Sequence, residues 1–167
     1  MVFDMKVDEE PINAYENIIE RVAIRGVVLH KNKILLVETS KGDLKFPGGG
    51  LEEGETVEEC LLREIKEETG YIQIECKQLI GKYIQRRYDA FNNSDVFQST
   101  SYYYICQIEN FQKVDVQLDD YEQDLQFQSK WVSLDEAIKQ NLQAIAQPEA
   151  NGWVGRELVV LSQLKSL

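Results

Sequence analysis

Glu64, Glu67 and Glu68 stand close together near the end of the segment ETVEECLLREIKEETG, residues 55–70. At spacings of three and four residues, three carboxylates lie on one face of an α-helix. The last turn of a helix carries partial negative charge, so acids are locally unfavourable there. The cost is small, roughly 0.2–0.5 kcal/mol for the Glu64–Glu68 pair, and a solvated acidic face would tolerate it. A divalent cation would instead convert the repulsion into ligation, because Mg²⁺ takes carboxylate oxygens and completes its shell with phosphate oxygens.

The helix that must position these acids has clear start and stop signals. Thr56 and Glu59 form a T-x-x-E capping box, which predicts that the helix begins at Thr56. Gly70 supplies the usual glycine stop. Leu61, Leu62 and Ile65 form an apolar stripe beside the acids, suited to packing on a sheet. A glycine-rich loop, KFPGGG, precedes the helix.

The flanking sequence predicts mostly strands before and after this helix, with further helix near the end. Residues 1–20 are polar and mixed, and residues 14–20 suggest either a short helix or an extended lead-in. The predicted elements are a β-hairpin of 21–30 and 34–40, one or two strands within 72–88 with a break near Gly81, a loop at 89–96, a strand at 97–108, an acidic loop including 118–124, a strand ending at Trp131-Val132, and helices at 134–141 and 155–164. This order predicts a mixed sheet covered on both faces by helices.

The length and net charge of the chain limit the kinds of partner that the protein is expected to bind. The chain has 167 residues and a net charge of −11, from 29 acids and 18 bases. Such a field repels nucleic acid and anionic membrane surfaces, so neither is an expected partner. A polyanionic substrate would need a bridging cation or a locally basic pocket. The length fits one domain, residues 1–167.

Cysteine use and the N-terminal segment indicate a reducing, cytoplasmic location. Cys60, Cys76 and Cys106 are odd in number and widely spaced, which argues against a disulfide framework or a cysteine-based zinc site. The opening MVFDMKVDEEP has no apolar signal region, and no apolar run reaches the length of a membrane span.

The segment from Gly49 to Tyr71, GGLEEGETVEECLLREIKEETGY, resembles the signature of the Nudix hydrolases. That signature is a glycine, five residues, a glutamate, seven residues, then Arg-Glu-aliphatic-x-Glu-Glu-x-Gly and a final aliphatic residue. The matching residues here are Gly49, Glu55, Arg63, Glu64, Ile65, Glu67, Glu68 and Gly70. Only the last position departs, because Tyr71 replaces an aliphatic side chain.

The resemblance implies an α/β (α+β) fold, an α/β/α sandwich with a central mixed β-sheet. It also implies hydrolysis of a nucleoside diphosphate linked to another moiety, using Mg²⁺ or Mn²⁺. Carried over position by position, the metal ligands would be Glu64, Glu67 and Glu68, with the Gly48 carbonyl and Glu55 close by. Arg63 would orient the acids.

Candidates outside this motif leave alternatives open. The family often places another acid in a downstream loop, and Glu122 and Asp124 occupy the comparable region, with Glu122 the candidate for the active site. Asp119 and Asp120 compete with them, and a solvated acidic loop is the plain alternative.

Four further residues could contact substrate: Arg25, Arg86, Arg87 and Tyr88. Arginine matches phosphate geometry. The alternative for Arg86 and Arg87 is an exposed strand end, which is slightly favoured, and the alternative for Arg25 is a side chain that faces solvent. Tyr88 follows Tyr71 at a spacing similar to a tyrosine marker of diadenosine polyphosphate hydrolases. The proline that marks ADP-ribose hydrolases is absent from residues 77–91. His30, the single histidine, falls at a hairpin turn and is expected to be exposed.

The expected function is therefore a metal-dependent pyrophosphohydrolase. A nucleoside triphosphate or modified nucleotide is the favoured small-molecule substrate, followed by a dinucleoside polyphosphate. The alternative is a Nudix-fold module that senses a nucleotide without hydrolysing it. The sequence leaves a homodimer open.

Overall fold

A computed structural model of the chain describes residues 1–13 and 17–166. The strands are β1 (Phe3–Asp8), β2 (Asn17–His30), β3 (Lys33–Glu38), β4 (Leu44–Lys45), β5 (Gly48–Gly50), β6 (Ile74–Tyr88), β7 (Asp95–Ile108) and β8 (Gln128–Val132). The helices are α1 (Val57–Thr69), α2 (Asp120–Asp124), α3 (Leu134–Ile145) and α4 (Val154–Leu164).

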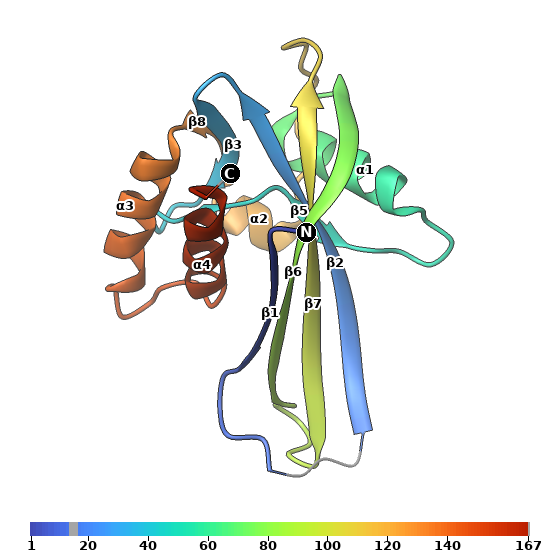
Figure 1. The fold of residues 1–167 in the computed structure, drawn as a ribbon, viewed down its shortest axis with the longest axis vertical. Helices are drawn as coiled ribbons and strands as arrows, with labels where there is room; N and C mark the ends of the chain where they lie inside the picture. Colours follow the sequence, from blue (N-terminus) through green and yellow to red (C-terminus); the bar gives the residue numbers. More distant parts are fainter. Residues whose placement is uncertain (14–16, 167) are drawn as a thin grey trace.

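The strands form a mixed sheet in the order β1-β6-β7-β2-β3-β4, with β5 paired to β2 and β8 paired to β3. The pairs β1–β6 and β2–β7 are parallel, and the pairs joining β6 to β7 and β2 to β3 are antiparallel. Strands β1, β6, β7 and the first half of β2 extend well beyond the helices as a long blade (Figure 1). The helices lie around the other end of the sheet, which is also where β5 leads into α1.

Two apolar cores lie on opposite faces of the sheet because side chains alternate along β2. Val27 joins the core under α3 and α4, together with Phe46, Tyr103 and Leu161. Ile24 and Val28 join the core under α1, whose contributors include Cys60, Leu61 and Ile65. The sheet is thus covered by α1 on one face and by α3 and α4 on the other, which confirms the predicted fold class.

Most of the predicted elements are found, with small shifts of their ends. The hairpin forms between β2 and β3, and the helices predicted at 134–141 and 155–164 are α3 and α4. Residues 72–88 contain a single strand, β6, and the expected break is an irregularity in its pairing between Leu79 and Gly81. The loop predicted at 89–96 ends slightly early, because β7 begins at Asp95.

Three expectations about the fold were wrong or incomplete. The polar N-terminal stretch contains β1, and its Phe3 is buried against Gly81 and Tyr103. The acidic loop at 118–124 contains the short helix α2. His30 is half-buried, because its ring packs against Phe111 and Trp131. For the lead-in, residues 17–20 are extended, and residues 14–16 lie outside the described part of the chain.

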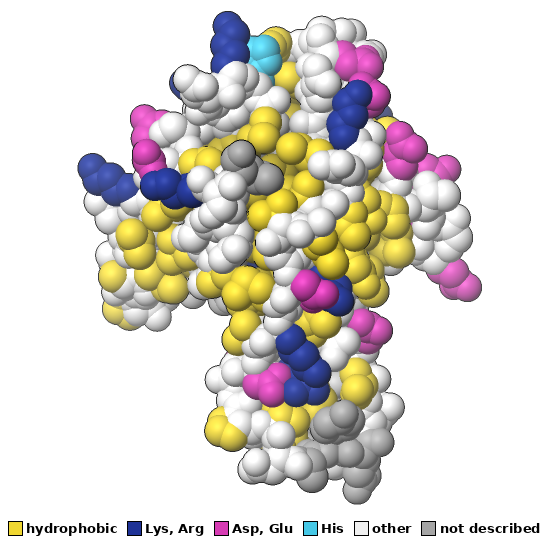
Figure 2. Space-filling model, viewed as in Figure 1, with side chains coloured by type: hydrophobic (Ala, Val, Ile, Leu, Met, Phe, Trp, Pro, Cys, Tyr) yellow, Lys and Arg dark blue, Asp and Glu magenta, His cyan; other side chains and the backbone are white. Residues whose placement is uncertain are grey.

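Lys and Arg side chains are scattered, not gathered into one patch, on the face drawn in Figure 2. On the blade of that face they lie beside Asp and Glu side chains. In the described residues, none of the helices combines the length and apolar character that a bilayer crossing needs.

Candidate active site

Helix α1 carries the acidic cluster, and its ends are fixed by the residues that the sequence predicted. The Thr56 hydroxyl accepts a hydrogen bond from the Glu59 backbone N–H, and the Glu59 carboxylate accepts one from the Thr56 N–H. At the other end Gly70 adopts a left-handed conformation with φ 79° and donates to the Lys66 carbonyl. Both caps satisfy backbone groups that a helix otherwise leaves unpaired.

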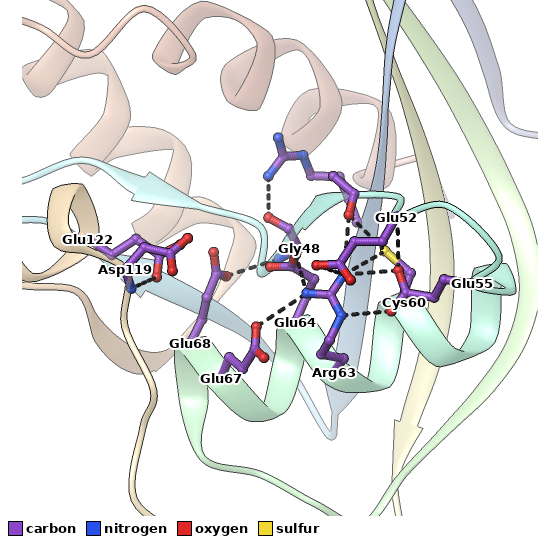
Figure 3. A network of polar contacts seen from close by, with 12 residues as sticks. Gly48, Glu52, Glu55, Cys60, Arg63, Glu64, Glu67, Glu68, Asp119 and Glu122 are labelled. Carbon is purple, nitrogen blue, oxygen red and sulfur yellow. Dashed lines mark hydrogen bonds and ion pairs between the residues drawn. The ribbon is translucent and has the colours of Figure 1, made fainter.

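Arg63 is the hub of the cluster (Figure 3). Its guanidinium donates to both carboxylate oxygens of Glu55, at 2.7 and 3.0 Å. It also reaches one oxygen of Glu64 at 2.8 Å and one oxygen of Glu67 at 3.3 Å. Hydrogen bonds from Arg63 lower the pKa of Glu55 to about 2. The carboxylates of Glu55 and Glu64 in turn raise the pKa of Arg63. One planar cation therefore orients three of the predicted acids.

Glu68 has a different partner and is deeply buried, with 1% of its side chain exposed. Lys45 lies 2.5 Å from Oε1, and the Gly48 N–H donates to Oε2 at 3.0 Å. Burial raises the pKa of Glu68 to about 7, although Lys45 and the Gly48 hydrogen bond act in the opposite direction. Glu64 is less buried, and burial again outweighs Arg63 to raise its pKa. Burial thus disfavours the charged forms of Glu64 and Glu68, and the cations Arg63 and Lys45 favour them.

The glycine-rich loop approaches the cluster at distances that only glycine allows. A Cβ on Gly49 would lie 2.5 Å from both carboxylate oxygens of Glu64. Gly48 has φ +141°, and a Cβ there would lie 2.1 Å from the Ile24 carbonyl oxygen. The Gly48 carbonyl oxygen accepts a hydrogen bond from Arg25 Nη1 at 2.8 Å. The loop therefore brings backbone groups and an arginine of β2 to the glutamates of α1.

Side chains from α3 and α4 hold the strand that leads into this loop. The Asn141 side chain is fully buried and bonds both backbone groups of Leu44, at 2.7 Å to N and 2.8 Å to O. Glu157, also fully buried, accepts from the Phe46 N–H at 2.9 Å through Oε2. Its Oε1 accepts from Arg156. These contacts fix the segment that carries Lys45 and Gly48.

Sequence reasoning missed Lys45, Asn141 and Glu157. The alternation of β4 offers no sign that Lys45 points inward, because the strand has only two residues. Asn141 and Glu157 lie far along the chain from their partners, and no motif marks them. A buried-face position on an amphipathic helix is the only signal that could have indicated them.

Glu122 lies at the edge of the candidate site, and it is a buried residue of a short helix instead of an exposed residue of a loop. It lies on α2 with 5% exposure, where it accepts from the Asp119 N–H at 2.9 Å and from the Tyr121 hydroxyl at 3.1 Å. Its carboxylate points toward the end of α1 that carries Glu68 (Figure 3). Burial raises the pKa of Tyr121, and the negative charges of Glu122 and Glu68 add to that effect. The Tyr121 hydroxyl therefore lies within electrostatic reach of both Glu122 and Glu68. The neighbouring acids Asp120 and Asp124 are exposed.

The basic candidates on β6 separate onto two faces of the blade. Arg86 pairs with Asp8 on β1, with Nε 2.7 Å from Oδ1. Arg87 lies over the Phe97 ring, 5.5 Å from its centroid, and lines a pocket beside α4. The Tyr88 hydroxyl accepts from the Asn13 N–H at the far end of the blade. The structure therefore brings Arg25 to the cluster, but it does not bring Arg86 or Tyr88 there.

The donor set suits a hard divalent ion, which prefers carboxylate and carbonyl oxygens. As the side chains stand, no three His, Cys, Asp or Glu residues within the described ranges converge in a metal-binding arrangement. Each carboxylate of the cluster instead contacts a cation of the protein, Lys45 for Glu68 and Arg63 for Glu55, Glu64 and Glu67. Arg63 takes one oxygen from each of Glu64 and Glu67, which leaves the second oxygen of each outside its contacts.

Comparison with known proteins places this arrangement in a family. The family model for the NUDIX domain matches residues 20–152. An ADP-ribose pyrophosphatase of Methanocaldococcus jannaschii is 50% identical over 66 residues, 37% of this chain and 38% of that protein. Nudix hydrolase 2 of Arabidopsis thaliana is 36% identical over 97 residues, 54% of this chain and 33% of that protein. The matched segments thus span 38% and 33% of the length of these two relatives.

Solved structures agree on the fold. A NUDIX hydrolase from Nitrosomonas europaea superimposes with a TM-score of 0.55 at 25% identity, covering 87% of this chain and 89% of that chain. The Ap4A hydrolase of C. elegans gives a TM-score of 0.54 at 19% identity, covering 89% and 98%. Because the family model spans most of the chain and its signature acids form the cluster described above, this protein belongs to the NUDIX domain family.

Proposed function

We propose that this protein is a metal-dependent pyrophosphohydrolase that cleaves a nucleoside diphosphate linked to another moiety. The observation that carries the proposal is the position of Glu64, Glu67 and Glu68 on one face of α1, with Glu68 buried against the Gly48 N–H and Lys45. An acidic cluster that only faces solvent would not require a buried Glu68 or the backbone conformation of Gly48, which favours glycine. Family membership supports the same reaction class.

We propose Mg²⁺ or Mn²⁺ as the cofactor, with Glu64, Glu67 and Glu68 as ligands and with Glu55 and the Gly48 carbonyl close by. When bound, such an ion would neutralise the pyrophosphate and stabilise the charge that develops on the leaving oxygens. Arg63 would keep Glu55 and Glu64 oriented through its hydrogen bonds. Arg25, whose Nη1 already bonds the Gly48 carbonyl, would present its remaining donors to a phosphate.

Glu122 is proposed as the proton acceptor or an additional ligand. Its support is its burial and its direction toward Glu68 in Figure 3. The contacts to Asp119 and Tyr121 would hold it in place until substrate arrives. A general base need not be fully aligned before the substrate is bound.

Nucleoside triphosphates or modified nucleotides are the first substrates to test, and dinucleoside polyphosphates are the second. The Methanocaldococcus jannaschii relative, named as an ADP-ribose pyrophosphatase, adds ADP-ribose to the panel. We propose a small-molecule nucleotide as the partner, a cytoplasmic location, and no nucleic acid or membrane partner; a homodimer remains to be tested by solution scattering.

The test is turnover of this panel with Mg²⁺ or Mn²⁺, with products resolved by chromatography. Glu67→Gln and Glu68→Gln are expected to lower kcat by several orders of magnitude. Glu58→Gln is the matched control, because Glu58 is an exposed acid of the same helix. Near wild-type rates in the purified Glu67 and Glu68 variants at saturating Mg²⁺ would remove the metal assignment. Nucleotide binding without any metal-dependent turnover would favour the sensing module instead.

A further inference from the structure

Cys76 and Cys106 face each other across the strands β6 and β7. They are register partners in this antiparallel pair. Residues opposite each other in such a pair point to the same face of the sheet, with Cα atoms roughly 4.5–5.5 Å apart. A disulfide bond requires a Cα separation of about 4.4–6.8 Å, so the strand pairing already suits one. Both thiols are free in this structure.

The two thiols lie in the apolar core under α1 and differ in their access to solvent. Cys106 belongs to this core and is 2% exposed, whereas Cys76 packs against the core and is half-buried. The ends of β6 and β7 that carry them lie beside α1 (Figure 1). A small dissolved reagent can therefore reach Cys76 more easily than Cys106.

The two sulfur groups also affect each other's protonation. A hydrogen bond with the Cys106 thiol lowers the pKa of Cys76, although burial and the negative charge of Glu58 act in the opposite direction. The same contact, together with burial, raises the pKa of Cys106. The thiolate is the form of cysteine that attacks an oxidant. Cys76 is therefore the nucleophile of the pair, and Cys106 is a thiol held next to it.

The strand pairing is irregular directly beside Cys76. Cys76 is paired with Cys106, but Gln78 is paired with Ile105, so β6 has one extra residue, Lys77, between the two pairs. A bulge of this kind disrupts the ladder locally. The pairing of β6 with β7 also begins close by, at the first residue of β6. This part of the hairpin can thus adjust to the short distance between two bonded sulfurs more easily than the middle of the ladder could.

Cys60, the third cysteine, has a different environment in the same core. It lies on α1, is completely buried, and donates its thiol to the Gly50 carbonyl at 3.5 Å. Its thiol is thus bonded to a backbone oxygen and lacks the exposure of Cys76. Cys60 therefore provides an internal control for the reactivity of the facing pair.

We propose that Cys76 and Cys106 form a reversible oxidative modification site that reacts with hydrogen peroxide. The Cys76 sulfur attacks one peroxide oxygen, the O–O bond breaks, and the products are a sulfenic acid and water. The Cys106 sulfur then attacks the Cys76 sulfur and the S–O bond breaks. The leaving hydroxide takes the Cys106 proton and departs as a second water.

The overall reaction oxidises two thiols to one disulfide and reduces one peroxide to two waters. A dithiol reductant reverses it by thiol–disulfide exchange. The modification site goes beyond the proposed function and does not depend on it, because neither cysteine belongs to the glutamate cluster of α1.

The test treats the reduced, folded protein with excess hydrogen peroxide, alkylates the remaining thiols and maps the tryptic peptides by mass spectrometry. Trypsin places each cysteine on its own peptide, residues 46–63, 67–77 and 88–113. The peptides of Cys76 and Cys106 should be linked to each other with the loss of two hydrogen atoms, and dithiothreitol should separate them. The pair should be oxidised at least about tenfold faster than Cys60, which should remain alkylated.

Single alanine variants separate the roles of the three cysteines. In Cys106→Ala the Cys76 sulfenic acid has no neighbouring thiol to react with, so it should take up further oxygen and accumulate as the sulfinic acid. Cys76→Ala should lose the fast reaction, because Cys106 is buried. Cys60→Ala is the matched control and should form the disulfide as the wild type does. Circular dichroism would verify that each variant is folded, and the wild-type map decides the linkage if a variant is not.

Three alkylated cysteines after peroxide treatment, a linkage that includes Cys60, or disulfide-linked dimers in place of the internal bond would overturn the proposal. Equal rates of oxidation at all three cysteines would overturn it as well. The assay measures mass and not turnover, so its outcome is separable from that of the proposed function. A protein that forms the linkage without hydrolysing any nucleotide would keep the thiol pair and remove the enzyme, and the converse result would do the opposite.

Discussion

The Lys45 ammonium lies 2.5 Å from the Glu68 carboxylate, and both side chains are at least 96% removed from solvent. A buried carboxylate needs a cationic or hydrogen-bonding partner, because its desolvation is otherwise not offset. In this structure the partner is a lysine from the strand that precedes the glycine-rich loop. Under the proposed function a divalent ion would share that role, so Lys45 and the metal should partly substitute for each other.

Lys45→Met should therefore destabilise the metal-free protein by about 3–5 kcal/mol, because it leaves the buried Glu68 carboxylate without its cation and with only the Gly48 N–H as a partner. Mn²⁺ or Mg²⁺ should restore part of the loss, since ligands that bind only the native state stabilise it. Urea unfolding in EDTA and in excess metal measures both effects. Lys41→Met, at an exposed lysine of the neighbouring turn, is the control. Equal losses in the two variants, or no recovery with metal, would refute this role for Lys45.

Arg63→Lys should weaken metal binding by about 10–100-fold while the fold is kept, which is the usual effect of losing an outer-shell partner. The reason is geometric, because an ammonium cannot reproduce the forked contacts that hold Glu55, Glu64 and Glu67. Calorimetric titration with Mn²⁺ measures the change. Arg21→Lys, an exposed arginine on β2, provides the comparison. Wild-type affinity in Arg63→Lys would show that the guanidinium does not orient the acids.

Glu38 provides a prediction about pH that is independent of the metal. Burial disfavours its charged form, but hydrogen bonds from Lys130 and Gln140 outweigh burial and lower its pKa below 4.5. A lowered folded pKa stabilises the fold above the unfolded pKa, and this contribution is lost as pH falls through the folded pKa.

Glu38→Gln should therefore lower the free energy of unfolding at pH 7 by up to about 1 kcal/mol, a typical size for a partly exposed ion pair. The gap to the wild type should close as the pH falls through the lowered pKa of Glu38 in the folded protein, where the wild-type carboxylate becomes neutral as well. Urea unfolding at several pH values measures the gap. A gap that does not change with pH would show that the charge of Glu38 contributes nothing.

The signature helix was predictable because its signals are local. The capping box at Thr56, the stop at Gly70 and the spacing of the acids all lie within one short segment, and the structure has both caps. Strand β1 was also within reach: Phe3, Met5 and Val7 alternate with charged residues, but the neighbouring polar stretch obscured the pattern.

The supports of the site could not be predicted in the same way. The Asn141 side chain accepts a hydrogen bond from the Leu44 N–H although the two residues are 97 positions apart in the sequence. Glu157 accepts one from the Phe46 N–H across 111 positions. Such contacts depend on how α3 and α4 pack, which no local pattern specifies. The helix α2 was missed because a five-residue helix rich in acids has the composition of a loop.

The central claim is that a divalent ion binds among the glutamates of α1, and calorimetry with Mn²⁺ and Mg²⁺ tests it most directly. The wild type and Glu58→Gln should show saturable binding of similar affinity, whereas Glu67→Gln and Glu68→Gln should bind at least about tenfold more weakly. No binding by the wild type, with or without nucleotide, or unchanged affinity in both variants, would contradict the account.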